Sequence, residues 1–124
     1  MEQLLLHLFG DYISQTEWMA REKVKKNRAA IAHASIYTLP FIFLTQSIYA
    51  LMVIGITHYL IDRYRLVRYL IFFKNKITDW NLKWKDCSST GFHKDTPPWL
   101  SVWLMIIIDN TIHLIVNYMA IKYL

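Results

Sequence analysis

Cysteine is almost absent from this sequence, since Cys87 is the only one among 124 residues. It has no partner for an internal disulfide, and no cysteine pair has the spacing of a zinc knuckle or a redox motif. The basic start and small-residue end of a cleavable signal peptide are also missing, because residues 1–18 carry His7, Asp11 and Glu17. We therefore expect the first segment to remain in the mature protein.

Hydrophobic residues dominate what is present. They make up 55% of the chain and give a mean hydropathy of +0.22, which is too apolar for an ordinary soluble domain. The length leaves room for a single domain, residues 1–124. A net charge of +5 is compatible with nucleic-acid binding, but the basic residues fall in blocks beside long apolar runs. That distribution favours membrane lipids as partners. Assembly into a homo-oligomer is a further alternative, and no nucleic-acid partner is expected.

Four apolar segments predict an all-α integral membrane protein built as a four-helix bundle. The expected spans cover residues 3–20, 29–45, 47–63 and 99–121. The first span is apolar on one side only, and Pro40 predicts a kink near the far end of the second. Residues 64–84 mix apolar and aromatic side chains with Lys and Arg, so we expect an amphipathic interfacial segment before the last span.

The basic residues also predict an orientation. They crowd the first and third connectors, whereas the second connector and the C-terminus are nearly uncharged. The positive-inside rule then places both basic connectors in the cytoplasm and both termini outside.

Three His–Asp pairs recur at a spacing of four residues, each in a different expected span. They are His7 with Asp11, His58 with Asp62, and Asp109 with His113. Residues four apart share one face of a helix. A charged carboxylate at the bilayer centre costs about 2.5–3.5 kcal/mol, so an intramembrane Asp indicates a functional site. At a rise of about 1.5 Å per residue, Asp11, His58 and Asp109 are expected to meet at similar depth.

Imidazole and carboxylate groups together are the ligands that suit a divalent first-row metal ion. Zinc is the first expectation, and manganese and iron are the other candidates. A bound ion would neutralise buried carboxylates and lower the pKa of a water molecule, which supplies a nucleophile for hydrolysis. No Ser or Cys with a paired base offers another nucleophile. The competing interpretation is that these side chains form hydrogen bonds between helices.

The remaining polar residues receive supporting roles in this hypothesis. His33, in the second expected span, would donate the proton to the leaving group. Gln15 and Asn117 would orient ligands or substrate, although amides commonly bridge helices as well. Lys23 or Arg63 would bind a substrate phosphate, although basic connectors are mostly topology signals and lipid contacts.

Several of these residues belong to motifs that run through nearly the whole chain. The motifs are His7-x-x-x-Asp11-aromatic-x-x-Gln15, His33-Ala-Ser-Ile-Tyr37, Thr57-His58-Tyr-Leu-Ile-Asp62 and Ile108-Asp109-Asn110-Thr-Ile-His113. This sequence resembles a small membrane family of bacteria and their phages, the domain of unknown function 3307. More distantly it is similar to the membrane-bound metal-dependent hydrolases. In the first family, a Gln is expected where Asn110 stands.

The resemblance implies a helical domain with a polar His/Asp cluster in the bacterial inner membrane. A phage gene is an alternative source of such a protein. The family has no established activity that could be assigned to this chain. The leading hypothesis is a membrane-embedded metal-dependent hydrolase that uses metal-activated water on a phosphoester or lipid-linked substrate. The alternatives are a small ion or proton conductor, and a phage-borne membrane effector or inhibitor in which the cluster is structural.

Overall fold

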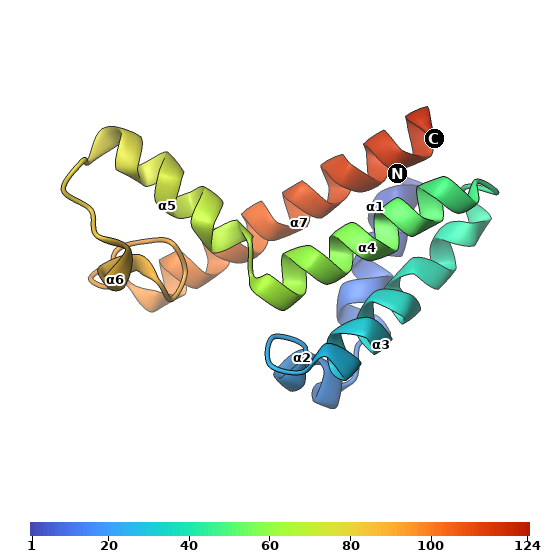
Figure 1. Cartoon of the computed structure of the whole chain (residues 1–124), viewed down its shortest axis with the longest axis horizontal. Helices are drawn as coiled ribbons and strands as arrows, with labels where there is room; N and C mark the ends of the chain where they lie inside the picture. The colour runs from blue at the N-terminus through green and yellow to red at the C-terminus, as the bar shows by residue number, and fades with distance from the viewer. The chain divides into compact units, whose positions relative to one another are not determined.

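The computed structural model describes residues 1–124 and is entirely helical (Figure 1). It contains seven α-helices, one π-helical segment (η1) and one 3-10 segment (η2), and no strand. The all-α prediction is therefore confirmed. The chain forms two compact units: unit 1 comprises Met1–Tyr64 and Ile112–Leu124, and unit 2 comprises Arg65–Thr111.

The N-terminal segment of unit 1 is divided into three short helical pieces. These are α1 (Glu2–Leu8), η1 (Phe9–Ile13) and α2 (Glu17–Glu22). The chain breaks before α2 because Thr16 has an extended backbone and its hydroxyl accepts a hydrogen bond from the Met19 amide at 3.3 Å. The prediction of one continuous helix over the first expected span is therefore wrong.

A helical hairpin forms the body of unit 1. It comprises α3 (Asn27–Thr38), η2 (Leu39–Phe43) and α4 (Ile48–Tyr64). Helix α3 ends at Thr38, and the tighter η2 begins at Leu39 with Pro40, which lacks an amide hydrogen, as its second residue. The hydroxyl of Ser47 accepts a hydrogen bond from the Ala50 amide at 3.3 Å and so caps the start of α4.

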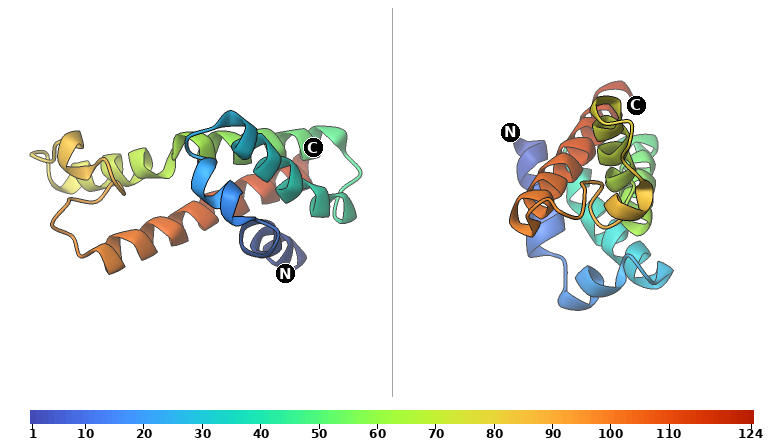
Figure 2. Two further views of the ribbon diagram at one scale, coloured as in Figure 1. Left: turned by 90° about the horizontal axis from the view of Figure 1, so that it is seen from below. Right: turned by 90° about the vertical axis from the view of Figure 1, so that its left-hand side faces the viewer.

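Small residues let α3 and α4 approach each other closely. A Cβ on Gly55 of α4 would lie 2.9 Å from the Thr38 hydroxyl oxygen of α3, so the glycine makes this approach possible. Figure 2 shows the N-terminal segment passing from the C-terminal part of α7 to the start of α3. The buried hydrophobic cluster of unit 1 consists of Tyr37, Phe41, Ala50, Ile54 and Ala120.

Unit 2 packs an amphipathic helix against a loop. It contains α5 (Val67–Thr78), α6 (Trp84–Cys87) and the first part of α7. Gly91 has a φ of +87°, and a Cβ there would clash with the Arg68 carbonyl oxygen. Burial raises the pKa of the Cys87 thiol, which keeps this sulfur in its neutral form.

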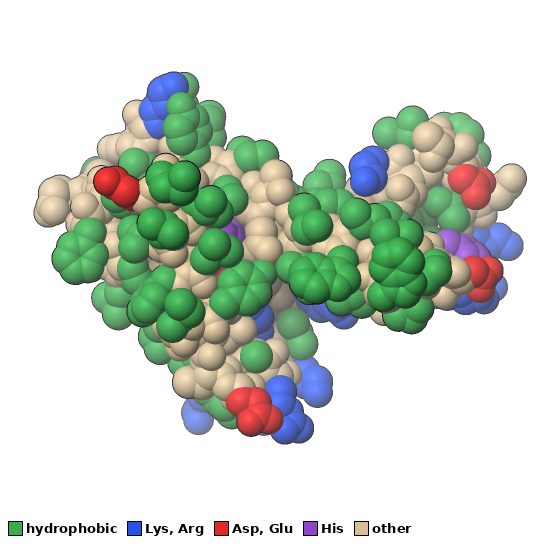
Figure 3. Space-filling model, turned by 180° about the vertical axis from the view of Figure 1, so that it is seen from behind, with side chains coloured by type: hydrophobic (Ala, Val, Ile, Leu, Met, Phe, Trp, Pro, Cys, Tyr) green, Lys and Arg blue, Asp and Glu red, His purple; other side chains and the backbone are tan.

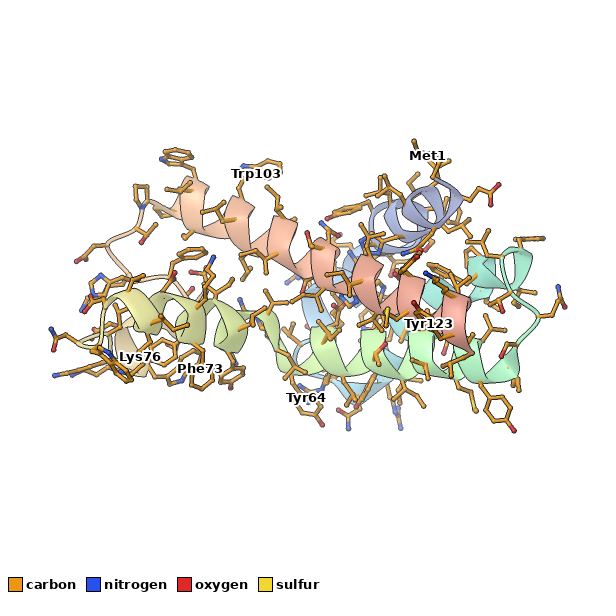
Figure 4. All side chains as sticks on the ribbon, turned by 90° about the horizontal axis from the view of Figure 1, so that it is seen from above. Met1, Tyr64, Phe73, Lys76, Trp103 and Tyr123 are labelled. Atoms are coloured by element: carbon orange, nitrogen blue, oxygen red, sulfur yellow. The ribbon has the colours of Figure 1, made fainter.

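The last helix, α7 (Pro98–Tyr123), is the one helix long and apolar enough to cross a membrane by itself. Its 26 residues give a length of about 39 Å, against a hydrocarbon core of about 30 Å. Hydrophobic side chains cover much of the face shown in Figure 3. In Figure 4, Trp103 on α7 and Phe73 on α5 point away from their helices. The structure supports one candidate span, and the four-span arrangement is considered below as a proposal.

Candidate metal centre

Three segments of unit 1 bring imidazole and carboxylate groups to one buried place. Asp11 comes from η1, His33 from α3, and His58 and Asp62 from consecutive turns of α4. One ligand atom from each of these residues lies within 4.8 Å of those from the other three, and all four residues are buried. The cluster could therefore hold a metal ion. Asp11 and His58 meet here, as expected from helix depth, whereas Asp109, the third residue of that expectation, does not belong to this group of four.

Three of these ligand atoms form a nearly equilateral triangle. The Nε2 atoms of His33 and His58 are 2.9 Å apart, and each lies 3.3 Å from Asp11 Oδ1. Ligands bound tetrahedrally to zinc at 2.0–2.1 Å are about 3.3–3.4 Å from one another. The triangle thus has close to the dimensions of one face of a tetrahedral site. Two histidines with one carboxylate are also a familiar ligand set for catalytic zinc and non-haem iron.

Asp11 occupies an unusual backbone element. It lies at the centre of a π-helical turn, a feature frequently found at functional sites. Its Oδ1 atom is buried and has no hydrogen-bond partner, although it lies 3.3 Å from the two imidazole nitrogens. A buried carboxylate oxygen without a donor is costly. A cation between Asp11 Oδ1 and the two imidazoles would remove that cost.

Asp62 lies at the fourth corner and has several partners. Its Oδ2 atom is 3.1 Å from His33 Nε2 and 3.5 Å from His58 Nε2. The Lys23 ammonium donates a hydrogen bond to the same Oδ2 at 2.6 Å. His113 Nε2 lies 3.2 Å from the other oxygen, Oδ1. Asp62 therefore connects the cluster to α2 and α7.

The contacts of Asp62 define the tautomers of two neutral imidazoles. A carboxylate only accepts, so His113 donates from Nε2 and its Nδ1 atom carries a lone pair. His58 Nδ1 lies 3.2 Å from that atom and must be the donor. The hydrogen of His58 is then on Nδ1, and its Nε2 atom presents a lone pair to the triangle. Such support from outside the ligand shell is typical of metal-binding histidines.

The contact between the Lys23 ammonium and His33 indicates which ring nitrogen of His33 carries a lone pair. Its Nζ atom lies 3.2 Å from His33 Nε2, and an ammonium can only donate. We infer that in a neutral imidazole the Nε2 atom of His33 also carries a lone pair. The Nε2 atom of His33 then lies within reach of the Lys23 ammonium, of His58 Nε2 and of Asp11 Oδ1.

Tyr37 organises the other side of the cluster. Its ring stacks on His58 with centroids 3.6 Å apart and an interplanar angle of 12°. Its hydroxyl oxygen accepts a hydrogen bond from Asn117 Nδ2 at 2.6 Å and lies 2.7 Å from His7 Nδ1, to which it can donate. A Cβ on Gly10 would lie 2.5 Å from the Tyr37 ring, so only a glycine at this position leaves room for the ring.

The other predicted site residues have different surroundings. His7 Nδ1 lies 3.5 Å from Asp11 Oδ2, outside the triangle. Gln15 lies in the break between η1 and α2, where its Oε1 atom is buried without a hydrogen-bond partner. Arg63 donates to Asn27 Oδ1 and to two carbonyl oxygens of the connector before α3. Asp109 is half-buried on α7 within unit 2.

Sequence reasoning missed two features of the centre. The first is the hydrogen-bonding role of Tyr37, although its spacing of four residues from His33 places both on one face of α3. The second is the Lys23–Asp62 ion pair, which joins residues 39 positions apart. No local pattern predicts a contact of that separation.

The fold and the centre define an all-helical protein with a buried His/Asp cluster able to hold a metal ion. The chain belongs to the family described as "Protein of unknown function (DUF3307)", which it matches over residues 1–123. No curated protein and no solved structure matches it. The resemblance to this family is therefore confirmed, and the more distant one to metal-dependent hydrolases stays a prediction.

Proposed function

We propose that this protein is a membrane-embedded metal-dependent hydrolase that acts on a phosphoester or lipid-linked substrate. The observation that carries the proposal is the triangle formed by His33 Nε2, His58 Nε2 and Asp11 Oδ1. Its atoms lie 2.9–3.3 Å apart, and they are two imidazole nitrogens and a carboxylate oxygen, all of which can bind a metal ion. A cation bound to them would offset the cost of burying the carboxylate.

Zinc suits the proposal best among the divalent ions. Two imidazole nitrogens and a carboxylate oxygen are common zinc ligands, and the triangle has the edge lengths of a tetrahedral site. Manganese and iron accept the same ligand types and are tested alongside zinc. In this assignment His33 binds the ion and does not donate the proton to the leaving group, because its Nε2 atom faces the other ligands.

Hydrolysis follows from the position of Asp62. A divalent ion would lower the pKa of a water molecule to near neutrality and so supply the nucleophile. Asp62 Oδ2, 3.1 Å from His33 Nε2, would accept the proton that this water loses. The water oxygen would form a bond to the phosphorus atom as the ester P–O bond broke. Asp62 would then return the proton to the leaving oxygen, so that the reaction would yield an alcohol and a phosphate.

Substrate would enter beside Lys23. The side chain of Lys23 is 19% exposed, whereas those of His33 and His58 are 1% exposed, so the site opens on the lysine side. Arg63 donates to the connector before α3, whereas the Lys23 ammonium contacts Asp62 and His33 of the centre, so Lys23 is the cation placed to bind a substrate phosphate. Gln15 is proposed to orient ligands from the α2 side, and Asn117 acts through the Tyr37 hydroxyl.

The membrane location and the four spans belong to this proposal. Large hydrophobic side chains are exposed along α4 as well as α7, including Met52 and Ile56 on α4 and Ile107 and Ile115 on α7. Exposed apolar surface of this extent is typical of a lipid-facing protein. The basic connectors would lie in the cytoplasm.

Ile56→Lys is expected to impair membrane insertion. Ile56 is 57% exposed at the middle of α4, where a lysine costs about 2.5–3.5 kcal/mol if the helix crosses a bilayer. The control, Ile77→Lys, changes a residue that is 76% exposed on α5 in the expected headgroup region and should have little effect. The readout is the fraction of protein kept in membranes after alkaline carbonate extraction. Equal retention of both variants, or release of the wild type, contradicts the spanning of α4.

Metal content and hydrolysis test the proposed function together. Protein purified after metal-replete expression is expected to hold at least about one zinc, manganese or iron per chain by elemental analysis. The loaded protein should hydrolyse a chromogenic phosphodiester, and chelation should abolish the reaction until the metal is restored. A protein that takes up no metal contradicts the proposal.

The second candidate function is a purely structural role for the His/Asp cluster. The burial of the cluster favours this role. His33, His58 and His113 are each 1% exposed, which is typical of a closed structural site. Asp62→Ala separates the candidates, because loss of hydrolysis in a folded protein supports catalysis whereas collapse of the fold supports a structural cluster. The ion-conducting alternative stays a prediction.

A further inference from the structure

Lys23 reaches the ligand atoms of the centre with its own positive charge. Its Nζ atom is 2.6 Å from Asp62 Oδ2 and 3.2 Å from His33 Nε2, and both atoms belong to the group able to hold a metal ion. The two buried carboxylates of that group, Asp11 and Asp62, leave a negative charge that one ammonium only partly offsets. Lys23 therefore acts as a counter-ion at the position where a metal ion would bind.

Hydrogen bonds hold the backbone next to Lys23, whereas the Lys23 side chain is partly exposed to solvent. Arg63, which follows Asp62 on α4, donates to the carbonyl oxygens of Val24 at 2.7 Å and Lys25 at 3.2 Å. These bonds anchor the connector that begins at Lys23. The long lysine side chain is partly exposed and makes its polar contacts only through Nζ. The contacts of Nζ with Asp62 and His33 are therefore what holds it at the centre.

We propose that a metal ion replaces the Lys23 ammonium at the centre, and that the released ammonium then binds the anionic group of the substrate. The inference rests on the metal binding in the proposed function and assigns an anionic phosphoester as the substrate class. A divalent ion bound to His33 Nε2 and an ammonium 3.2 Å from the same atom cannot both stay there, because two positive charges about 4 Å apart repel strongly in a partly buried place. The ammonium moves to the exposed edge, where it faces any anion that approaches the metal. Metal binding thus precedes and enables anion binding.

Calorimetric titration of the full-length protein in detergent tests this exchange, with zinc first and inorganic phosphate second. Lys23→Met keeps the length of the side chain and removes its charge, so zinc should bind at least about tenfold more tightly. Phosphate should bind the zinc-loaded variant at least about tenfold more weakly than the zinc-loaded wild type. Lys23→Arg keeps the charge and should retain phosphate binding. The metal-free wild type should bind no phosphate.

Lys26→Met is the matched control. Lys26 belongs to the same connector and pairs with Glu22 at 2.7 Å, away from the centre, so this variant makes the same change in net charge. Zinc and phosphate binding should equal those of the wild type. Unchanged or weaker zinc binding by Lys23→Met overturns the exchange, and unchanged phosphate binding overturns the anion assignment. Both readouts are equilibria, so a failure of hydrolysis alone removes the proposed reaction and leaves this inference standing.

Discussion

Asp11→Asn is expected to weaken zinc binding at least about 100-fold while the protein stays folded. The amide has the shape of the carboxylate but carries no charge, and it replaces the oxygen that lies 3.3 Å from both His33 Nε2 and His58 Nε2. Loss of a supporting residue alone typically costs 10–100-fold in metal affinity, and Asp11 is proposed as a direct ligand. Competition with a chromogenic chelator measures the affinity, and circular dichroism measures the fold.

Asp86→Asn provides the control for this prediction. Asp86 is paired with Lys94 at 2.8 Å in unit 2, so its neutralisation changes the net charge equally without touching the centre. Thermal unfolding of the two metal-free variants and the metal-free wild type shows whether any change in zinc affinity comes with a change in stability. Zinc affinity equal to that of the wild type would remove Asp11 from the ligand set.

Gly10→Ala is expected to lower both the stability of the protein and its affinity for metal. The new methyl group would lie 2.5 Å from the buried Tyr37 ring, which is rigid and cannot rotate away as a flexible side chain can. Overpacking of this kind costs about 1–3 kcal/mol. The displaced ring would also disturb the stacked His58, and we expect zinc affinity to fall at least about tenfold. Thermal unfolding with and without zinc measures both effects.

Gly55→Ala separates packing from the centre. Its methyl group would meet the Thr38 hydroxyl oxygen at 2.9 Å, and neither residue belongs to the ligand group, so it should reduce stability without a change in zinc affinity. The zinc-dependent increase in melting temperature should therefore persist in Gly55→Ala and shrink in Gly10→Ala. If the two variants lose zinc affinity equally, Tyr37 has no specific role in positioning His58.

The helices predicted best are those with uniform apolar sequence. The last two expected spans, residues 47–63 and 99–121, correspond to α4 (Ile48–Tyr64) and α7 (Pro98–Tyr123). The break before α2 was not predictable from hydropathy, because the residues around Thr16 include neither glycine nor proline. Here a single hydroxyl that caps α2 decides where the helix begins.

The centre was predictable in composition and only partly in geometry. The spacing of four residues identified His58 and Asp62 as one face of α4, and both face the centre. Spacing cannot show which atoms of different helices meet, because that depends on packing. Thus the shortest contact between ligand atoms joins His33 and His58, which come from different helices, at 2.9 Å.

The π-helical turn that carries Asp11 makes the centre sensitive to chain length as well as to side-chain identity. A π-helix has about one more residue per turn than an α-helix, so deletion of one residue between Phe9 and Ile13 could restore a regular α-helix. Such a deletion would remove the wider turn in which Asp11 lies and would leave the helical segments on its two sides in nearly the same register. The loss of one residue here is therefore expected to move the Asp11 carboxylate away from His33 and His58 while the other ligand residues stay in place.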